Sequence, residues 1–283
     1  MKLPPFDYRA PTSLQEALAL LADHPGDARL LAGGQSLIPI LAFRLAQPAL
    51  LIDLRHVPSL NHIDINDSAT TLGAMVRWCE IEKSEPLPQA QPLLYDACLH
   101  IAHFQIRNRG TVGGSLAHAD PAAELPGVAV CCEARIRLSS GQEIAAAEFF
   151  TGALQTTLAP EEMILAVVFP AWPAARKWGF AEFARRPGDL AIAGIALFYD
   201  LDMAGRARDA HIAVIGATNL PMRLSSAEAR LNGADLNEAA LAAVAQAAAD
   251  SADPPADIHA SIAYRKSLVA TLVRRALVQA MSR

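Results

Sequence analysis

Two glycine pairs constrain this chain more than any other feature, because each is followed by a hydroxyl residue and an apolar run typical of a helix. The first lies in Ala32-Gly33-Gly34-Gln35-Ser36-Leu37 and the second in Thr111-Val112-Gly113-Gly114-Ser115. Consecutive glycines let backbone amides approach a ligand, since no Cβ holds it away. Amides at the start of a helix attract anions. Each pair alone is equally typical of a tight turn, but the two together favour a diphosphate held from both sides, as in a dinucleotide.

The commoner nucleotide motifs are absent from the sequence. It contains no G-x-x-x-x-G-K-[ST], and no G-x-G-x-x-G with an acidic residue about twenty positions on. These absences argue against a P-loop NTPase and against an ordinary dinucleotide-binding dehydrogenase.

An acidic segment follows the second glycine pair. Asp120 and Pro121 have the order expected of a helix N-cap and first position, so we predict a helix from Pro121. Glu124 then lies in the first turn and is placed to accept hydrogen bonds from ribose hydroxyls. His118 fits either a ligand contact or a hydrogen-bonded loop histidine.

Composition excludes several classes of protein. The chain has 283 residues, of which 52% are hydrophobic and 19% charged, with a net charge of −5. It is therefore neither disordered nor a nucleic-acid binder. No run reaches the roughly 18–20 apolar residues of a membrane-spanning helix, and the N-terminus lacks a signal core, so we expect a cytoplasmic protein.

The cysteines show no metal-binding pattern. Cys79, Cys98 and the pair Cys131-Cys132 form no C-x-x-C or C-x₄-C-x₂-C spacing, which predicts no iron–sulfur or zinc site in this chain. The pair follows an apolar run and is expected to be buried and inert. His100 and His103 are one turn apart but have no third ligand nearby in the sequence.

The order of helix and strand signals predicts an α+β protein. Ser13 and Glu16 form a capping box before the first helix, and residues 171–175 resemble a linker. The other predicted helices are 36–46, 92–103, 236–250 and 262–281. The predicted strands are 28–32, 50–54, 63–65, 70–74, 134–139, 178–183, 191–200 and 210–217.

The two glycine motifs, with Pro5-Phe6-Asp7-Tyr8 and the segment from Phe183 to Asp189, resemble the FAD-binding medium subunit of molybdenum hydroxylases. Carbon monoxide dehydrogenase, quinoline oxidoreductase and nicotine dehydrogenase belong to that group, and xanthine dehydrogenase has the same module as a domain. The resemblance implies a two-lobed FAD-binding domain, with lobes 1–56 and 57–173. A small α+β C-terminal domain of a three-stranded sheet and helices, 174–283, would follow.

The resemblance also implies which residues bind FAD. The two glycine motifs would hold the diphosphate, Glu124 would lie near the adenosine ribose, and Ile164 would pack on the flavin or adenine. Arg185 and Asp189 belong to the segment that closes over the isoalloxazine, where Leu190 replaces the Tyr of some relatives. The complete set is Ala32, Gly33, Gly34, Gln35, Ser36, Leu37, Thr111, Gly113, Gly114, Ser115, His118, Asp120, Glu124, Ile164, Arg185 and Asp189.

The implied function is electron transfer within a larger complex. In the resembled enzymes a large molybdenum subunit carries a molybdopterin cofactor, and a small iron–sulfur subunit carries [2Fe–2S] clusters that pass electrons to FAD. FAD then reduces an external acceptor. We therefore expect a hetero-oligomer, such as a dimer of heterotrimers, and no catalytic acid or base in this chain. Alternatives are a self-sufficient flavin-dependent oxidoreductase of the same fold, or a non-redox nucleotide-binding protein.

Overall fold

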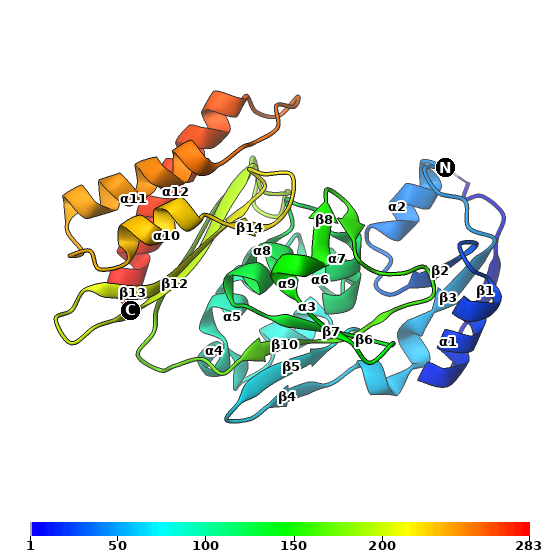
Figure 1. Ribbon diagram of the computed structural model, residues 1–283. Coiled ribbons are helices and arrows are strands. Elements are labelled where there is room, and N and C mark those ends of the chain that lie inside the picture. Colours follow the sequence, from blue (N-terminus) through cyan, green and yellow to red (C-terminus); the bar gives the residue numbers. More distant parts are fainter. Residues whose placement is uncertain (1) are drawn as a thin grey trace.

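The N-terminal part of the chain is built on a three-stranded parallel sheet of order β1-β3-β2 (Figure 1). The computed structural model describes residues 2–283. Ser13 accepts a hydrogen bond from the amide of Glu16 (3.2 Å), which confirms the predicted start of the first helix. The elements of this part are β1 (Asp7–Arg9), α1 (Leu14–Asp23), β2 (Ala28–Leu31), α2 (Leu37–Ala42) and β3 (Leu50–Asp53).

Helix α2 is shorter than the predicted 36–46. It ends at Phe43, whose amide donates to the carbonyl of Pro39, and Arg44 then has a left-handed φ of 59°. That conformation does not continue a right-handed helix, so the apolar pattern extends further than the helix does.

The middle part contains a five-stranded antiparallel sheet of order β4-β5-β10-β6-β7. Pairing of Ile63 with Leu72 confirms the predicted hairpin. Its strands are β4 (Ile63–Ile65), β5 (Ala69–Gly73), β6 (Arg135–Leu138), β7 (Glu143–Ala145) and β10 (Ile164–Pro170), with a separate hairpin of β8 (Phe150–Gly152) and β9 (Gln155–Thr156). Its helices are α3 (Trp78–Glu82), α4 (Leu87–Ala90), α5 (Pro92–His100), α6 (Phe104–Arg107), α7 (Val112–His118), α8 (Glu124–Cys131) and α9 (Ala146–Phe149).

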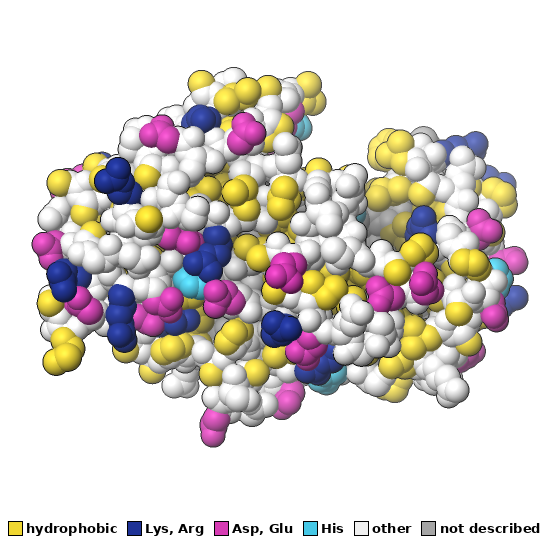
Figure 2. Space-filling view, in the orientation of Figure 1, with side chains coloured by type: hydrophobic (Ala, Val, Ile, Leu, Met, Phe, Trp, Pro, Cys, Tyr) yellow, Lys and Arg dark blue, Asp and Glu magenta, His cyan; other side chains and the backbone are white. Residues whose placement is uncertain are grey.

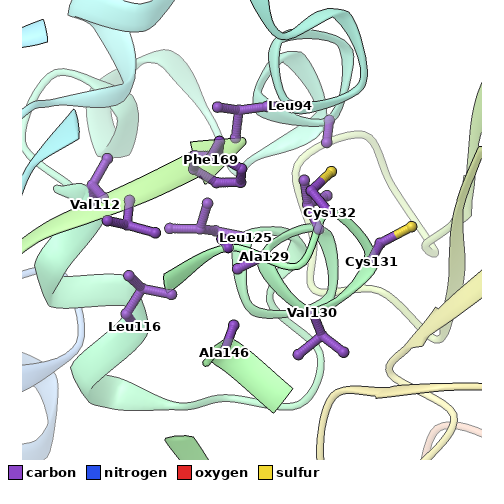
Figure 3. Packing of buried hydrophobic residues seen from close by; sticks show 14 of the residues in the cluster. Leu94, Val112, Leu116, Leu125, Ala129, Val130, Cys131, Cys132, Ala146 and Phe169 are labelled. Atoms are coloured by element: carbon purple, nitrogen blue, oxygen red, sulfur yellow. The ribbon is translucent and has the colours of Figure 1, made fainter. Parts of the chain in front are cut away.

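Helix α8 lies at the centre of the largest hydrophobic core, where every one of its residues is buried. Figure 3 shows Leu125 and Ala129 beside Phe169, with Cys131 and Cys132 at the far end of the helix. Both thiols are buried, as predicted, and this burial raises the pKa of the Cys131 thiol well above its ordinary value.

The helix predicted from Pro121 begins instead at Glu124, with Ala123 as its N-cap. Asp120 is therefore not the helix cap. Its Oδ1 accepts from the amide of Ala122 (2.9 Å) in a turn, while the carbonyl of Pro121 accepts from Gly216 (2.8 Å). This long-range bond holds residues 121–123 away from the helix.

The C-terminal part is an antiparallel sheet of order β11-β12-β13-β14, covered on one face by α10, α11 and α12 and on the other by α5 and α8 (Figure 1). The three predicted strands are confirmed, but a two-residue fourth strand and helix α10 were not predicted. The elements are β11 (Lys177–Phe183), β12 (Ala193–Leu201), β13 (Ala207–Ile215), β14 (Met222–Arg223), α10 (Ser225–Leu231), α11 (Glu238–Ser251) and α12 (Ile262–Met281).

The sheet of the C-terminal part shares the core of the middle part. Phe180, Phe198 and Ile215 belong to the same buried cluster as Leu125 and Phe169. The middle and C-terminal parts therefore share one continuous hydrophobic core. Among residues 2–283 no helix is both long and apolar enough to cross a membrane.

Candidate functional site

A cavity of about 570 Å³ runs between the N-terminal part and the rest of the chain. Figure 2 shows the surface hollowed beside the lobe that carries α2. The volume falls within the range of roughly 300–1,000 Å³ typical of ligand sites. Its walls come from the first glycine loop, from residues 101–124, from residues 156–164 and from residues 188–190.

Fifteen of the sixteen residues predicted to bind FAD line this cavity. The exception is Arg185, which is exposed and donates to the carbonyl of His259 at 3.4 Å. Asp189 does line the cavity, and so does Leu190, whose side chain is 61% exposed. The segment after β11 thus contributes to the wall through its later residues.

The first glycine loop offers hydrogen-bond donors to the cavity. Within residues 2–283, the amides of Gly33, Gly34, Gln35 and Ser36 have no hydrogen-bond partner. Gly34 has a φ of 74°, which favours glycine. The side chain of Gln35 donates back to the carbonyl of Gly33 (2.9 Å) and holds the loop in shape. A run of unpaired amides of this kind is suited to an anion.

The second glycine loop is different, because its amides are already used. The amide of Val112 donates to Val76 (2.9 Å) and that of Gly113 to Ala74 (2.8 Å). The amide of Gly114 donates to the Thr111 hydroxyl (3.2 Å), which caps α7. The expectation that both loops present free amides is therefore wrong for the second loop. Its contribution to the cavity is hydroxyl groups and close backbone packing.

The two loops lie in direct contact. A Cβ on Gly33 would be 2.8 Å from the carbonyl carbon of Arg109 and from the Cα of Gly110, and closer still to the Arg109 carbonyl oxygen. A Cβ on Gly114 would be 3.5 Å from the Cβ of Ala32. Glycine at position 33 is thus required for the loops to meet.

Charges along the cavity are mostly negative. The lining carboxyl groups are Asp120, Glu124, Glu162 and Asp189, whereas Arg29 is the lining guanidinium. Arg29 is held by the carbonyls of Gly26 (3.1 Å) and Ala28 (2.8 Å). A ligand anion in this cavity would therefore depend chiefly on amides and hydroxyls, since few cations are available to balance its charge.

Glu124 is the most perturbed of these acids. Its side chain is almost fully buried, and burial together with the nearby charge of Asp120 raises its pKa to about 7. As the first residue of α8, it lies in the first turn of the helix, as predicted. His118, at the end of α7, also lines the cavity.

Arg107 supports the cavity wall from behind. It pairs with Glu82 (2.7 Å) and donates to the carbonyls of Ile101 (3.0 Å) and Ala102 (2.9 Å), both of which line the cavity. The Arg107 side chain is mostly buried in this network, so it holds the wall in place and does not itself contact the cavity.

His100 and His103 face different neighbours. The ring of His100 lies 5.0 Å from that of Phe180, whereas His103 lies against Gly188. Among the described residues, no group of three metal-ligating side chains gathers.

Several lining residues had no sequence signal of their own. Met75, Trp78, Thr156 and Pro160 reach the cavity from turns and short elements that carry no recognisable motif. Trp78 is the first residue of α3, whose first turn contains Glu80, and that pattern indicates a helix and not a ligand.

Two family models match the chain. Residues 4–172 match the FAD binding domain in molybdopterin dehydrogenase, and residues 178–280 match the CO dehydrogenase flavoprotein C-terminal domain. The first model alone covers more than half of the chain. The fold and cavity described above are thus those of a flavoprotein class.

Known proteins are similar over the entire chain. The 6-hydroxypseudooxynicotine dehydrogenase complex subunit alpha of Paenarthrobacter nicotinovorans is 41% identical, over 100% of this chain and 97% of that protein. The nicotine 6-hydroxylase medium subunit of the same organism is 40% identical, over 100% of both. A solved carbon monoxide dehydrogenase from Hydrogenophaga pseudoflava superposes with a TM-score of 0.95 at 35% identity, over 100% of this chain and 99% of that one.

The chain belongs to the family of FAD-binding medium subunits of molybdenum hydroxylases. It is therefore a flavoprotein subunit of an oxidoreductase, with an α+β fold, as the resemblance implied. The residues present fit FAD on independent grounds: unpaired amides suit the diphosphate, and aliphatic wall residues such as Ile106 and Ile164 suit a flat aromatic ring.

Proposed function

We propose that this chain carries electrons between a small iron–sulfur subunit and an external acceptor. The family is that of medium chains of multi-subunit enzymes, and a large molybdenum subunit would complete the complex. The cysteines of this chain support placing the [2Fe–2S] clusters in a partner. Three of the four are buried, and burial raises the pKa values of Cys98 and Cys131, whereas cluster ligands are thiolates.

The observation that carries the proposal is the first glycine loop at the cavity. Unpaired amides from Gly33 to Ser36 would bind the diphosphate of FAD, with the hydroxyls of Thr111 and Ser115 opposite. Bound flavin supplies the chemistry that joins one-electron carriers to two-electron acceptors. The protein residues bind it, orient it and limit its contact with water.

The remaining assignments follow from position along the cavity. We propose that Ile164 packs against a ring of FAD, and that Glu124 accepts a hydrogen bond from a sugar hydroxyl. Asp189 and Leu190 would border the isoalloxazine, which would lie where the C-terminal part joins the lobes 1–56 and 57–173. The C-terminal domain would be 174–283. Arg185, exposed in the structure, is left out of the contact set.

Purification tests the proposal directly. The chain is expected to be yellow with flavin absorption, or to take up added FAD, and to co-purify from its native source with a small iron–sulfur chain and a large molybdenum chain. Failure to bind FAD would refute the flavin site. Turnover by the isolated FAD-loaded chain would instead support a self-sufficient flavoenzyme and refute the subunit role.

A further inference from the structure

Two glutamates from distant parts of the chain lie where the C-terminal sheet packs on α8. Glu182 of β11 is in register with Gly194 of β12, which pairs with Ile215 of β13. Ile215 in turn packs against Gly127, one helical turn along α8 from Glu124.

Glu124 begins α8 and lines the cavity with only 5% of its surface exposed. Glu182 lies on β11, where Phe180 on the same face contacts His100 of α5. Side chains alternate along a strand, so Glu182 faces the middle part, while Gly179 on the other face lies against Ala276 of α12.

Neither carboxyl group has a compensating cation. The Oε2 atom of Glu182 is buried and lacks any hydrogen-bond partner. Within residues 2–283, neither Glu124 nor Glu182 takes part in an ion pair. An unpaired buried carboxylate is costly, so an arrangement of this kind favours holding protons.

The electrostatics agree with the geometry. Burial, and then the charge of Glu124, raise the pKa of Glu182 to about 8, and the pKa of Glu124 is raised to about 7. A charge on Glu124 disfavours the charged form of Glu182, and Asp120 acts in the same way on Glu124. Both carboxyl groups therefore keep their protons to a higher pH than an ordinary glutamate does.

The surrounding ionisable groups do not neutralise this pair. Arg265 of α12 lies on the far face of the sheet, paired with Asp257 (2.6 Å), and Arg223 of β14 pairs with Glu228 (2.7 Å). Across residues 2–283, none of the other ionisable side chains on the elements packed around the two glutamates forms an ion pair with either of them. These side chains are Tyr95, Asp96, Cys98 and His100 of α5, His118 of α7, Cys131 of α8, Lys177 of β11, Tyr199 and Asp200 of β12, Arg208, Asp209 and His211 of β13, and Asp120 and Asp189 in loops.

We infer that Glu124 and Glu182 form a proton-binding pair linked to the charge in the cavity, which takes up a proton when that charge becomes more negative. The inference rests on the proposed function. Two electrons from iron–sulfur carriers bring no protons. FAD reduced in this cavity, with one proton of its own, would leave one uncompensated negative charge near Glu124. The pair would take one proton from solvent to balance that charge and would return it to solvent when the external acceptor removes the electrons.

Binding of FAD itself provides a test that needs no turnover, because its diphosphate also brings negative charge. FAD is titrated into the apo chain by calorimetry at pH 7.5, in two buffers of different ionisation enthalpy. The difference in heat counts the protons bound. We expect a net uptake of a substantial fraction of one proton, falling at least threefold in Glu182→Gln and in Glu124→Gln.

The control is Glu161→Gln, an exposed acid near the cavity wall that does not line it. It is expected to keep the proton uptake of the wild-type chain. The inference would be overturned if the binding enthalpy were the same in both buffers. It would also be overturned if the wild-type chain and both pair variants took up the same number of protons. Either result would leave FAD binding intact. Absence of any FAD binding would refute the proposed function instead. Glu182→Met serves if Glu182→Gln does not fold, and the same loss of uptake is expected.

The reduction potential gives a second readout in the whole complex. If one additional proton binds per two electrons, the equilibrium constant for reduction changes tenfold per pH unit, which shifts the reduction potential by about 30 mV. We expect the reduction potential of the wild-type complex to fall by this additional amount per pH unit between pH 7 and 9. The additional fall should be absent in Glu182→Gln. A slope unchanged by that substitution would contradict a proton link and leave Glu182 a purely structural residue.

Discussion

The contact between the two glycine loops predicts a specific effect of Gly33→Ala. The added Cβ would lie 2.8 Å from two backbone atoms of Arg109 and Gly110, whereas ordinary contacts begin at 3.4 Å. The loops must therefore separate by about 0.6 Å or more, and the obstructing atoms are backbone, which cannot rotate away. Overpacking of this kind costs about 1–3 kcal/mol.

This cost should appear as weaker FAD binding. Both loops line the cavity, so separating them moves the unpaired amides of the first loop away from the hydroxyls of the second. A loss of about 1–3 kcal/mol corresponds to a dissociation constant roughly 5- to 150-fold larger. The measurement is a titration of apo protein with FAD, followed by quenching of flavin fluorescence, with circular dichroism to verify folding.

Gly152→Ala provides the matched control. Its Cβ would meet only the end of the Gln155 side chain, at 3.2 Å, which has freedom to move. This variant should bind FAD as the wild-type chain does. If Gly33→Ala bound FAD with the affinity of Gly152→Ala, the loops would not need their close approach, and the two-loop description of the site would be refuted.

Three further substitutions test other parts of the structure. Arg107→Met removes the pairing with Glu82 and the donors that hold the wall at residues 101–102, so the FAD dissociation constant should rise several-fold in the same titration. Tyr8→Phe removes the 2.7 Å hydrogen bond to the buried Asp53 and should lower the free energy of unfolding by about 1–2 kcal/mol in urea. Glu182 has a raised pKa of about 8, so its proton stabilises the folded chain most below its ordinary pKa, and this contribution declines as the pH rises through 8. Apo wild-type protein should therefore lose more thermal stability between pH 5 and pH 8 than Glu182→Gln does; equal losses would contradict the raised pKa.

Local signals predicted the elements whose ends are fixed by neighbouring residues. The capping box at Ser13 correctly located α1, because its partner, Glu16, is three residues away. The Asp120-Pro121 pattern failed to locate α8, because a hydrogen bond from Gly216, far along the chain, holds that loop outside the helix. A local sequence pattern therefore locates the end of a helix only where no distant residue forms a hydrogen bond with the same backbone groups.

The residues of the candidate site show the same contrast between local sequence signals and long-range contacts. The glycine motifs were visible in the sequence because close backbone approach demands glycine wherever it occurs. Glu182 was not singled out, since nothing in the sequence of β11 shows that the face carrying Glu182 packs toward α8 and Glu124. The family resemblance implied that Arg185 contacts FAD, but the chain turns after β11 and only the later residues of that segment line the cavity.

The unequal roles of the two glycine loops lead to a last prediction. Gly113 lies against the backbone of Ala74, where a Cβ would be 2.6 Å from the Ala74 Cβ and 2.9 Å from its Cα, and its amide donates to the Ala74 carbonyl (2.8 Å). The second loop is thus fastened to the turn that follows β5. Gly113→Ala should lower the free energy of unfolding of the apo chain by about 1–3 kcal/mol.

Gly33→Ala, in contrast, alters a loop whose amides have no partners within the described chain. A substitution that mainly lowers apo stability marks a loop held in place by the protein itself. A substitution that mainly weakens FAD binding marks a loop that contacts the ligand. Urea unfolding of apo protein and FAD titration of the same samples would measure both quantities. If Gly113→Ala weakened FAD binding without changing apo stability, the second loop would also present its amides to the ligand, and its hydrogen bonds to Val76 and Ala74 would have to break when FAD binds.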